Sequence, residues 1–165
     1  MCGILGFSGL FKPDLLKKMS DRIAHRGMDG HGEFYFPEEK LGLAHRRLSI
    51  IDLSSNAHQP MWDQKKTIII TFNGEIYNFV KLKKNLLSLG YQFKSNSDTE
   101  VLLNLYLEYQ EEMLSMLNGI FAFAIFDFKK KTLFLARDNI GVKPLYYSEA
   151  NKGFILASEL KSILE

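Results

Sequence analysis

The sequence has a single cysteine, a net charge near zero and no long apolar run, and each scarcity excludes a class of protein. One cysteine, Cys2, cannot form an internal disulfide, which is typical of a reducing compartment. The longest apolar run, residues 119–126, is far shorter than the roughly 18 residues that suggest a membrane span. The net charge is +2 and the basic residues are scattered, so the sequence offers no concentrated basic face for nucleic acid.

Targeting, metal and nucleotide motifs are missing as well. The first lysine is Lys12, so the amino terminus lacks the basic and then apolar segments of a secretory signal. The four histidines have no zinc-site spacing, and one cysteine provides no thiolate pair. Neither GxxxxGK[ST] nor GxGxxG occurs. We therefore expect a soluble cytoplasmic protein that uses no metal or cofactor and binds neither membranes nor nucleic acid.

A chain of 165 residues, 46% hydrophobic and 24% charged, predicts one globular domain. Apolar periodicity and turn residues predict strands at 2–7, 33–36, 41–46, 67–72, 119–128, 132–137, 144–148 and 154–157, and helices at 14–25, 78–89, 98–109 and 159–165. Most strands are joined by tight turns, and the helices lie between groups of strands. This order is typical of an α+β domain with antiparallel sheets.

Three segments carry further information about the domain. The strand at 119–128 is apolar on both faces, so it needs a covering layer above and below. The segment 48–61 is polar and irregular, and loops of this kind often belong to a binding site. Residues 28–32 are rich in glycine and are predicted to form a flexible turn.

Some polar residues have an ordinary structural interpretation on local sequence. Asp14 and Asp98 each stand where a helix N-cap is expected, and for Asp98 the cap is favoured over a functional carboxylate. Asn73-Gly74 is typical of a type I′ hairpin turn, although a helix rather than a second strand is predicted after it. On the helix at 78–89, four apolar residues occur at helical spacing: Phe79, Leu82, Leu86 and Leu89.

Cys2 stands directly after the initiator methionine, and its small side chain allows methionine aminopeptidase to remove Met1. Cys2 would then carry a free α-amine beside its own thiol. Such an amine titrates at about 7.7–8.0 and a free thiol at about 8.5, so both can act near neutrality. An N-terminal cysteine can therefore be a nucleophile that supplies its own general base. The alternative is a small buried residue at the start of a strand.

Five ordered segments carry a resemblance to a known family. They are Met1-Cys2-Gly3-Ile4, His25-Arg26-Gly27-Met28-Asp29-Gly30, Arg47-Leu48-Ser49-Ile50-Ile51-Asp52, Asn73-Gly74-Glu75-Ile76-Tyr77-Asn78 and Ser97-Asp98-Thr99-Glu100. With them the chain resembles, over essentially its whole length, the glutaminase domain of glutamine-hydrolysing asparagine synthetases, which are class II glutamine amidotransferases. Met28 departs from the family's usual HRGPDG loop. Because methionine does not fix φ as proline does, a more mobile loop is expected.

The resemblance implies an N-terminal-nucleophile fold, an α+β four-layer αββα sandwich with two stacked, mainly antiparallel sheets. It implies L-glutamine as the substrate and Cys2 as the nucleophile. Asn73 and Gly74 are implied as an oxyanion hole, through a side-chain amide and a backbone N–H. The other substrate-binding residues that it implies are Arg47 at the α-carboxylate, Asp98 at the α-ammonium with Glu75 nearby, and Leu48, Ser49, Ile50 and Ile51 along the pocket. Arg26 is implied only as a supporting residue behind them.

The implied reaction begins with attack of the Cys2 sulfur on the side-chain amide, which releases ammonia and leaves a γ-glutamyl thioester for water to hydrolyse. The family's synthetase domain, which uses ATP and Mg²⁺, normally follows, and its SGGxDS loop does not occur here. We therefore expect residues 1–165 to be the glutaminase domain of a longer protein, and a homodimer is a further expectation. Two alternatives stay open: a sugar-phosphate amidotransferase, against which residues 47–52 argue, and a non-catalytic relative used for binding or regulation.

Overall fold

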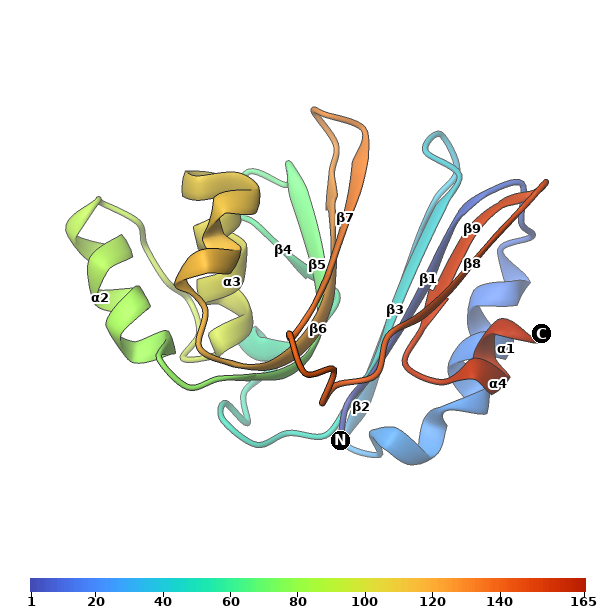
Figure 1. Ribbon diagram of the computed structural model, residues 1–165, viewed down its shortest axis with the longest axis horizontal. Helices are drawn as coiled ribbons and strands as arrows, with labels where there is room; N and C mark the ends of the chain where they lie inside the picture. The colour runs from blue at the N-terminus through green and yellow to red at the C-terminus, as the bar shows by residue number, and fades with distance from the viewer.

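The computed structural model consists of two stacked antiparallel sheets, each with helices on its outer face (Figure 1). It describes residues 1–149 and 151–165. The strand order is β2-β3-β1-β9-β8 in the first sheet and β4-β5-β6-β7 in the second. The strands are β1 (Gly3–Gly9), β2 (Gly30–Phe36), β3 (Leu41–Arg47), β4 (Met61–Trp62), β5 (Ile68–Ile76), β6 (Gly119–Asp127), β7 (Thr132–Arg137), β8 (Tyr146–Ala150) and β9 (Gly153–Ala157). The predicted α+β class with two antiparallel sheets is confirmed.

The helices form the two outer layers. α1 (Asp14–Arg22) and α4 (Leu160–Ile163) cover the first sheet, and α2 (Phe79–Ser88) and α3 (Asp98–Tyr109) lie on the side of the second sheet (Figure 1). Three short 3-10 segments, η1 (Ala24–Arg26), η2 (Ser55–Ala57) and η3 (Gln110–Met116), complete the elements. In the part of the chain that the structure describes, no helix combines the length and apolar character that crossing a membrane requires.

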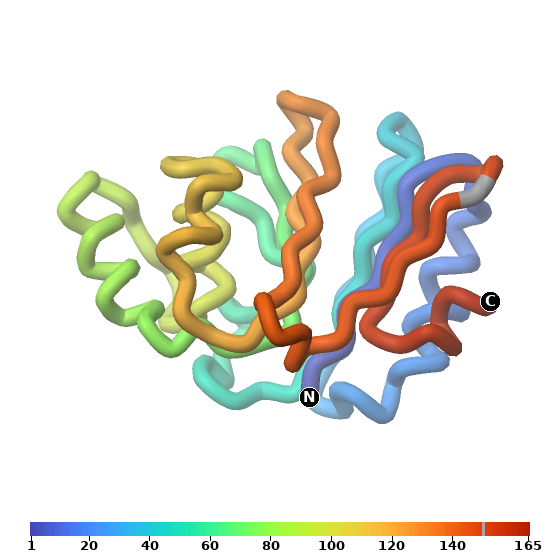
Figure 2. The backbone as a smooth tube through the Cα atoms, viewed as in Figure 1, coloured from blue at the N-terminus to red at the C-terminus, as the bar shows by residue number. Residues whose placement is uncertain are grey.

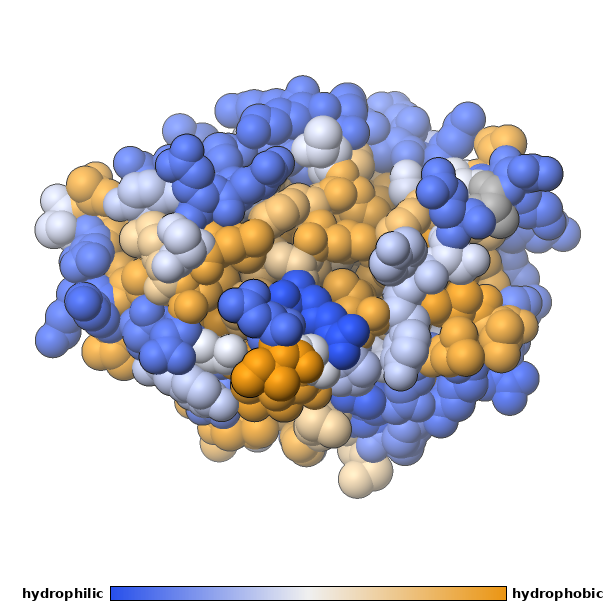
Figure 3. Space-filling model, in the orientation of Figure 1, coloured by the Kyte–Doolittle hydropathy of each residue, from blue (hydrophilic) through white to orange (hydrophobic). Residues whose placement is uncertain are grey.

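Apolar clusters fill the three interfaces between the four layers. Leu5, Phe7, Leu16 and Met19 belong to the cluster between the first sheet and α1, and Leu41, Leu43, Ile69 and Phe126 to the one between the sheets. The cluster between the second sheet and its helices includes Ile70, Phe72, Val101, Leu105 and Phe123. Figure 3 shows the apolar seam between the sheets reaching the surface in this view. Each sheet is therefore buried on both faces.

β6 explains why the second sheet needs two covering layers. Phe123 and Ile125 pack in the cluster on the helical side, whereas Ala124 and Phe126 pack against the first sheet. All residues from Phe121 to Asp127 are buried. The strand predicted to be buried on both faces is confirmed, because successive side chains of a strand point to opposite faces.

The boundary predictions were wrong at several elements. α1 ends at Arg22 instead of continuing to residue 25, because the chain tightens into the 3-10 segment η1. The N-cap of α1 is Pro13, so Asp14 is its first residue and not its cap. Residues 30–32 are not a flexible turn, because they pair with residues 45–47 as the start of β2. Leu89 is 53% exposed and follows α2 as its C-cap.

β5 is longer than predicted, and this changes the environment of Asn73-Gly74. The strand continues through Ile76 because β6 pairs with it residue by residue, with Asn73 opposite Ala122 and Gly74 opposite Phe121. The hairpin interpretation of Asn73-Gly74 is therefore wrong: both residues lie inside a strand.

Hydrogen bonds between the sheets fix how β5 lies against the first sheet. The Thr71 hydroxyl donates to the Ala44 carbonyl oxygen at 3.1 Å, and His45 Nε2 lies 3.1 Å from the Phe72 carbonyl oxygen. Burial lowers the pKa of His45 to about 3, so its neutral ring donates from Nε2. These contacts hold the end of β5 near the amino terminus, which Figure 2 places at the base of the two sheets.

Candidate active site

A cavity at the base of the sheets gathers most of the predicted site residues. Its wall includes the predicted Cys2, Arg47, Leu48, Ser49, Ile50, Ile51, Gly74, Glu75 and Asp98, together with His45, Asp52, Ala57, Gln59, Phe72, Ser97 and Thr99. These residues come from the start of β1, the end of β3 and the loop after it, the end of β5, and the start of α3. Asn73 lies next to Gly74 on β5, beside the cavity and not in its wall.

The sulfur of Cys2 lies against the backbone of Leu48. The Leu48 N–H donates to Sγ at 3.4 Å, and the Leu48 carbonyl oxygen lies 3.5 Å from Sγ. Burial raises the pKa of the Cys2 thiol, and the hydrogen bond from Leu48 and the positive charge of Arg47 oppose this only in part. In the structure Met1 precedes Cys2 and is 59% exposed, so it is accessible to an aminopeptidase.

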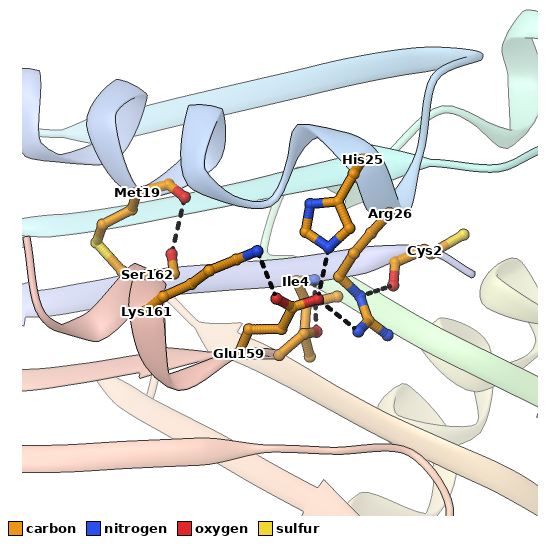
Figure 4. Close-up of polar contacts among 9 residues, drawn as sticks. Cys2, Ile4, Met19, His25, Arg26, Glu159, Lys161 and Ser162 are labelled. Carbon is orange, nitrogen blue, oxygen red and sulfur yellow. Dashed lines mark hydrogen bonds and ion pairs between the residues drawn. The ribbon is translucent and has the colours of Figure 1, made fainter.

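The carbonyl oxygen of Cys2 is held by a second residue. Arg26, from η1, donates from Nε to this oxygen at 2.9 Å (Figure 4). The Arg26 side chain is only 8% exposed and packs beside Gly3, where an added Cβ would lie 3.3 Å from Arg26 Cδ. The supporting position expected for Arg26 is thus a direct contact with the backbone of Cys2.

The backbone N–H of Gly74 points away from β6. In an antiparallel strand, every second residue directs its N–H to the same side. The N–H of Phe72 donates to Gln59 Oε1 at 2.6 Å, and the N–H of Ile76 donates to Asp98 Oδ2 at 3.1 Å, both on the side opposite β6. The Gly74 N–H lies between them on this same side, in the wall of the cavity.

Only glycine fits at position 74. A Cβ there would lie 2.3 Å from the Ile120 carbonyl oxygen and 2.7 Å from Phe121 Cα, both parts of the paired strand β6. A larger residue would push β5 away from β6 and would move the donor N–H.

The side chain of Asn73 points toward the first sheet. Thr71, two residues earlier on β5, reaches Ala44 in that sheet, and alternate side chains of a strand share a face. Asn73 is 1% exposed, and its Nδ2 has no hydrogen-bond partner among residues 1–149 and 151–165. A buried amide without a partner is costly, so this donor stands unsatisfied beside the cavity.

Arg47 supplies the positive charge of the cavity. Its guanidinium donates to the carbonyl oxygens of Asp52 and Ser54, and the residue is 7% exposed. Within the described part of the chain it has no carboxylate partner. Its charge therefore remains available for an anion.

Asp98 does not cap α3. The cap is Ser97, whose hydroxyl accepts from the Glu100 N–H, and Asp98 is the first helical residue. Its carboxylate lines the cavity with Glu75 and is 5% exposed. Burial, and to a smaller extent the charge of Glu75, raises the pKa of Asp98 to about 6. The cap predicted from local sequence was wrong, and the carboxylate is free to bind a cation.

The pKa of Asp98 leads to a stability prediction. Because the folded protein holds this proton more tightly than the unfolded chain, the stabilisation that the proton provides is fully present below the unfolded pKa of 3.8 and is lost as the pH rises through the folded pKa of about 6. Asp98→Asn keeps an acceptor for the Ile76 N–H and removes the buried charge. We expect the variant to be more stable than the wild type at pH 7.5 by roughly 2–3 kcal/mol, with the difference disappearing near pH 4, in urea unfolding.

A matched control lies in the same cavity. Hydrogen bonds from Ser54 and Asn96 lower the pKa of Asp52. Asp52→Asn should therefore change the free energy of unfolding in the opposite direction to Asp98→Asn and reduce stability at pH 7.5. Equal effects of the two variants, or a gain for Asp98→Asn that does not depend on pH, would contradict the assigned environment of Asp98.

Seven residues of the cavity wall were not predicted as site residues, and two of them, Gln59 and His45, make contacts that hold the site together. Gln59 accepts from the Phe72 N–H and donates from Nε2 to the Thr99 hydroxyl at 3.1 Å, so it ties the start of α3 to β5. His45 bridges the two sheets, but from sequence it was considered only as a metal ligand. The signal for Gln59 was its place in the irregular loop 48–61. For His45, local sequence offered no signal.

The rim of the cavity is exposed. Ile50 is 68% exposed, although it borders the cavity. Met28, which is not one of the residues of the cavity wall, is 86% exposed. The residue after Met28 is anchored, because Asp29 Oδ2 accepts from the Ser49 N–H at 2.7 Å and the Asp29 N–H donates to the Arg47 carbonyl oxygen at 3.0 Å. The greater mobility expected from Met28 remains a prediction.

Comparison with known proteins gives matches over nearly the whole chain. The family described as "Glutamine amidotransferase domain" matches residues 1–165. The chain is 44% identical to asparagine synthetase (glutamine-hydrolyzing) 1 of Bacillus subtilis and 42% identical to asparagine synthetase (glutamine-hydrolyzing) 3 of Arabidopsis thaliana, with 99% of this chain covered in both. It spans 27% and 28% of the lengths of these relatives.

Among solved structures, the fold is similar to glutamine phosphoribosylpyrophosphate amidotransferase from B. subtilis complexed with ADP and GMP. The TM-score is 0.83 over 98% of this chain and 43% of that chain. Because the sequences are only 24% identical, this similarity concerns the fold alone.

Proposed function

The chain belongs to the glutamine amidotransferase domain family, and from this premise we propose that it hydrolyses L-glutamine to glutamate and ammonia through a thioester on Cys2. Its fold is the N-terminal-nucleophile sandwich expected from the resemblance. The observation that carries the proposal is the cavity in which Cys2, Arg47, Gly74 and Asp98 meet from four separate parts of the chain. This arrangement supports both the binding of an amino acid and attack on its side chain.

The charges of the cavity suit a free amino acid. Glutamine is a zwitterion, so its site must provide a cation and an anion at different positions. Arg47, a planar guanidinium without a carboxylate partner in the described residues, would bind the α-carboxylate. Asp98, supported by Glu75, would bind the α-ammonium. Since the ammonium favours the ionised carboxylate, binding would lower the raised pKa of Asp98.

The end of β5 supplies two donors for the developing oxyanion. The Gly74 N–H lies in the wall of the cavity, and Asn73 Nδ2 is buried without a partner in the described chain. Backbone and amide donors that are already in place require no reorganisation when negative charge forms on the amide oxygen.

Proton transfers would fall to the α-amine that Cys2 carries after removal of Met1. The amine takes the thiol proton, and the sulfur attacks the amide carbon. The protonated amine then gives its proton to the departing nitrogen, and ammonia leaves a γ-glutamyl thioester. In the second half, the amine takes a proton from water as it attacks the thioester, and glutamate leaves with the sulfur reprotonated. Neither of these two steps, the formation of the thioester and its hydrolysis, uses a metal or a cofactor.

For the ammonia we propose an acceptor bound by a synthetase domain that follows residues 1–165. The relatives are named asparagine synthetases, which favours aspartate over a sugar phosphate as the acceptor. ATP and Mg²⁺ would be required only by that second domain. A homodimer and a cytoplasmic location remain predictions.

Intact mass spectrometry with a glutamine-mimicking diazoketone tests the proposal. We expect the purified protein to lack Met1 and to gain one covalent adduct on Cys2, because Cys2 is the only cysteine and lines the cavity. Excess glutamine should prevent the adduct. An adduct at another residue, or no adduct on protein that has lost Met1, would overturn the proposed mechanism and favour a non-catalytic role.

A further inference from the structure

A carboxylate from the C-terminal segment lies directly behind the residue that holds Cys2. Glu159 accepts from Arg26 Nη1 at 2.9 Å, and Arg26 donates from Nε to the Cys2 carbonyl oxygen at 2.9 Å. Figure 4 shows this chain of contacts, with Arg26 between Glu159 and the start of β1. Residues more than a hundred positions apart in sequence are therefore joined through one guanidinium.

Glu159 is placed by firm contacts on both sides. Its neighbour Ser158 accepts from the Ile4 N–H through Oγ at 2.9 Å and donates its own N–H to the Ile4 carbonyl oxygen at 2.8 Å. After it, the Ser162 hydroxyl donates to the Met19 carbonyl oxygen at 2.8 Å. The segment 158–162 is thus anchored to β1 and to α1, and the position of the carboxylate is fixed relative to Cys2.

The carboxylate of Glu159 also contacts two other basic side chains. His25 Nε2 lies 2.9 Å from Oε1, and Lys161 Nζ lies 3.1 Å from Oε2. Burial alone would raise the pKa of Glu159, but hydrogen bonds from Arg26, Lys161 and His25 outweigh it and lower the pKa to about 2. Glu159 therefore stays ionised at any pH at which the enzyme would work, and protonation does not break its ion pair with Arg26.

We propose that Glu159 is a positioning residue for the reaction at Cys2: it holds Arg26 so that the guanidinium fixes the first peptide group of the mature chain. This inference rests on the proposed function. Once Met1 is removed, Cys2 carries the free amine, and its carbonyl is the backbone group next to the reacting amine and sulfur. Without Glu159, Arg26 can turn away and that peptide group can tilt, so the sulfur spends less time in line with the amide carbon.

The test compares Glu159→Gln with Glu165→Gln. Glu165 is a matched control because it also pairs with an arginine, Arg22, on the same helical layer, and it does not contact Arg26. The side chains are similarly exposed, 19% for Glu165 and 23% for Glu159. The readouts are the rate of Cys2 alkylation at a saturating concentration of the diazoketone and, at a diazoketone concentration far below saturation, the concentration of L-glutamate that halves the alkylation rate. The second readout reports affinity without chemistry.

We expect Glu159→Gln to alkylate about tenfold to a hundredfold more slowly than the wild type, with the half-protecting glutamate concentration unchanged within about twofold. Glu165→Gln should match the wild type in both. In an Arg26→Ala background, the added Glu159→Gln change should have no further effect on the rate, because Glu159 acts through Arg26. Glu159→Asp, which keeps the charge and shortens the side chain, should give an intermediate rate and covers the case that Glu159→Gln does not fold.

Three results would overturn the inference. They are an alkylation rate for Glu159→Gln and Glu159→Asp no lower than for Glu165→Gln, a loss of glutamate affinity equal to the loss of rate, and an undiminished effect in the Arg26→Ala background. Failure of the wild type to react with the diazoketone would instead overturn the proposed function, so the two failures are distinguishable.

Discussion

Replacement of Cys2 by alanine is expected to lower glutamine hydrolysis by about 10⁴- to 10⁶-fold, because it removes the only thiol in the chain and with it the covalent route. Alanine is small enough for Met1 still to be removed, so the variant keeps a free α-amine at the same position. Any remaining rate measures what Arg47, Asp98 and the donors on β5 achieve without a nucleophile. The measurement is glutamate release from glutamine in the purified protein.

Binding should survive this substitution. The groups that would hold the α-carboxylate and the α-ammonium belong to β3 and α3, and Cys2→Ala touches neither element. Calorimetric titration with L-glutamate should therefore give an affinity within about threefold of the wild type, which is a difference in binding free energy of under about 1 kcal/mol. Glutamine turnover within about tenfold of the wild type would show that Cys2 is not the nucleophile, and would remove the basis of the proposed reaction.

Replacement of Asn73 by alanine is expected to lower kcat by about 10²- to 10³-fold and to leave the affinity for glutamate nearly unchanged. The amide nitrogen of Asn73 is buried without a partner among the described residues, so in the proposed mechanism the hydrogen bond that it loses in this variant is the one to the developing oxyanion. Asp98→Ala should do the reverse, mainly weakening binding, because it removes the partner of the ammonium. Steady-state kinetics and glutamate titration of both variants separate the two roles.

A control for the loss of a buried amide is available on α3. Asn104 is 6% exposed and its Nδ2 likewise has no partner in the described chain, but it does not border the cavity. Asn104→Ala should leave kcat unchanged. A loss of turnover in Asn104→Ala as large as in Asn73→Ala would mean that general loosening of the fold, and not a lost oxyanion donor, slows the reaction.

Part of the fold could be predicted from sequence because it depends on local patterns. β6 was identified as buried on both faces because its apolar residues occupy both sets of alternating positions, and alternation is a property of the strand itself. The antiparallel pairing of β6 with β7 fits two apolar runs joined by a short polar link, Lys129-Lys130-Lys131. The order of the site motifs and the place of Cys2 at position two could also be recognised from the sequence without the structure.

Other features were decided only by contacts between distant residues. Local sequence favoured Asp98 as a helix cap, but Ser97 takes that role and Asp98 faces β5 through the Ile76 N–H. The dipeptide Asn73-Gly74 is by itself typical of a hairpin turn, an interpretation that the predicted helix after it already weakens, and pairing with β6 keeps both residues in a strand. In each case a tertiary partner outcompeted the local preference, because a buried hydrogen-bonding group must find a partner wherever the fold provides one.

By itself the sequence determined the α+β class, the chemistry available at Cys2 and the set of polar residues that could serve an amino-acid substrate. The tertiary structure decided which of them meet, that Gly74 directs its N–H into the cavity, and that Glu159 lies behind Arg26. The physical reason is that burial patterns and nucleophile chemistry are properties of short segments. Hydrogen bonds such as Glu159 to Arg26 join residues whose separation along the chain carries no signal of their contact.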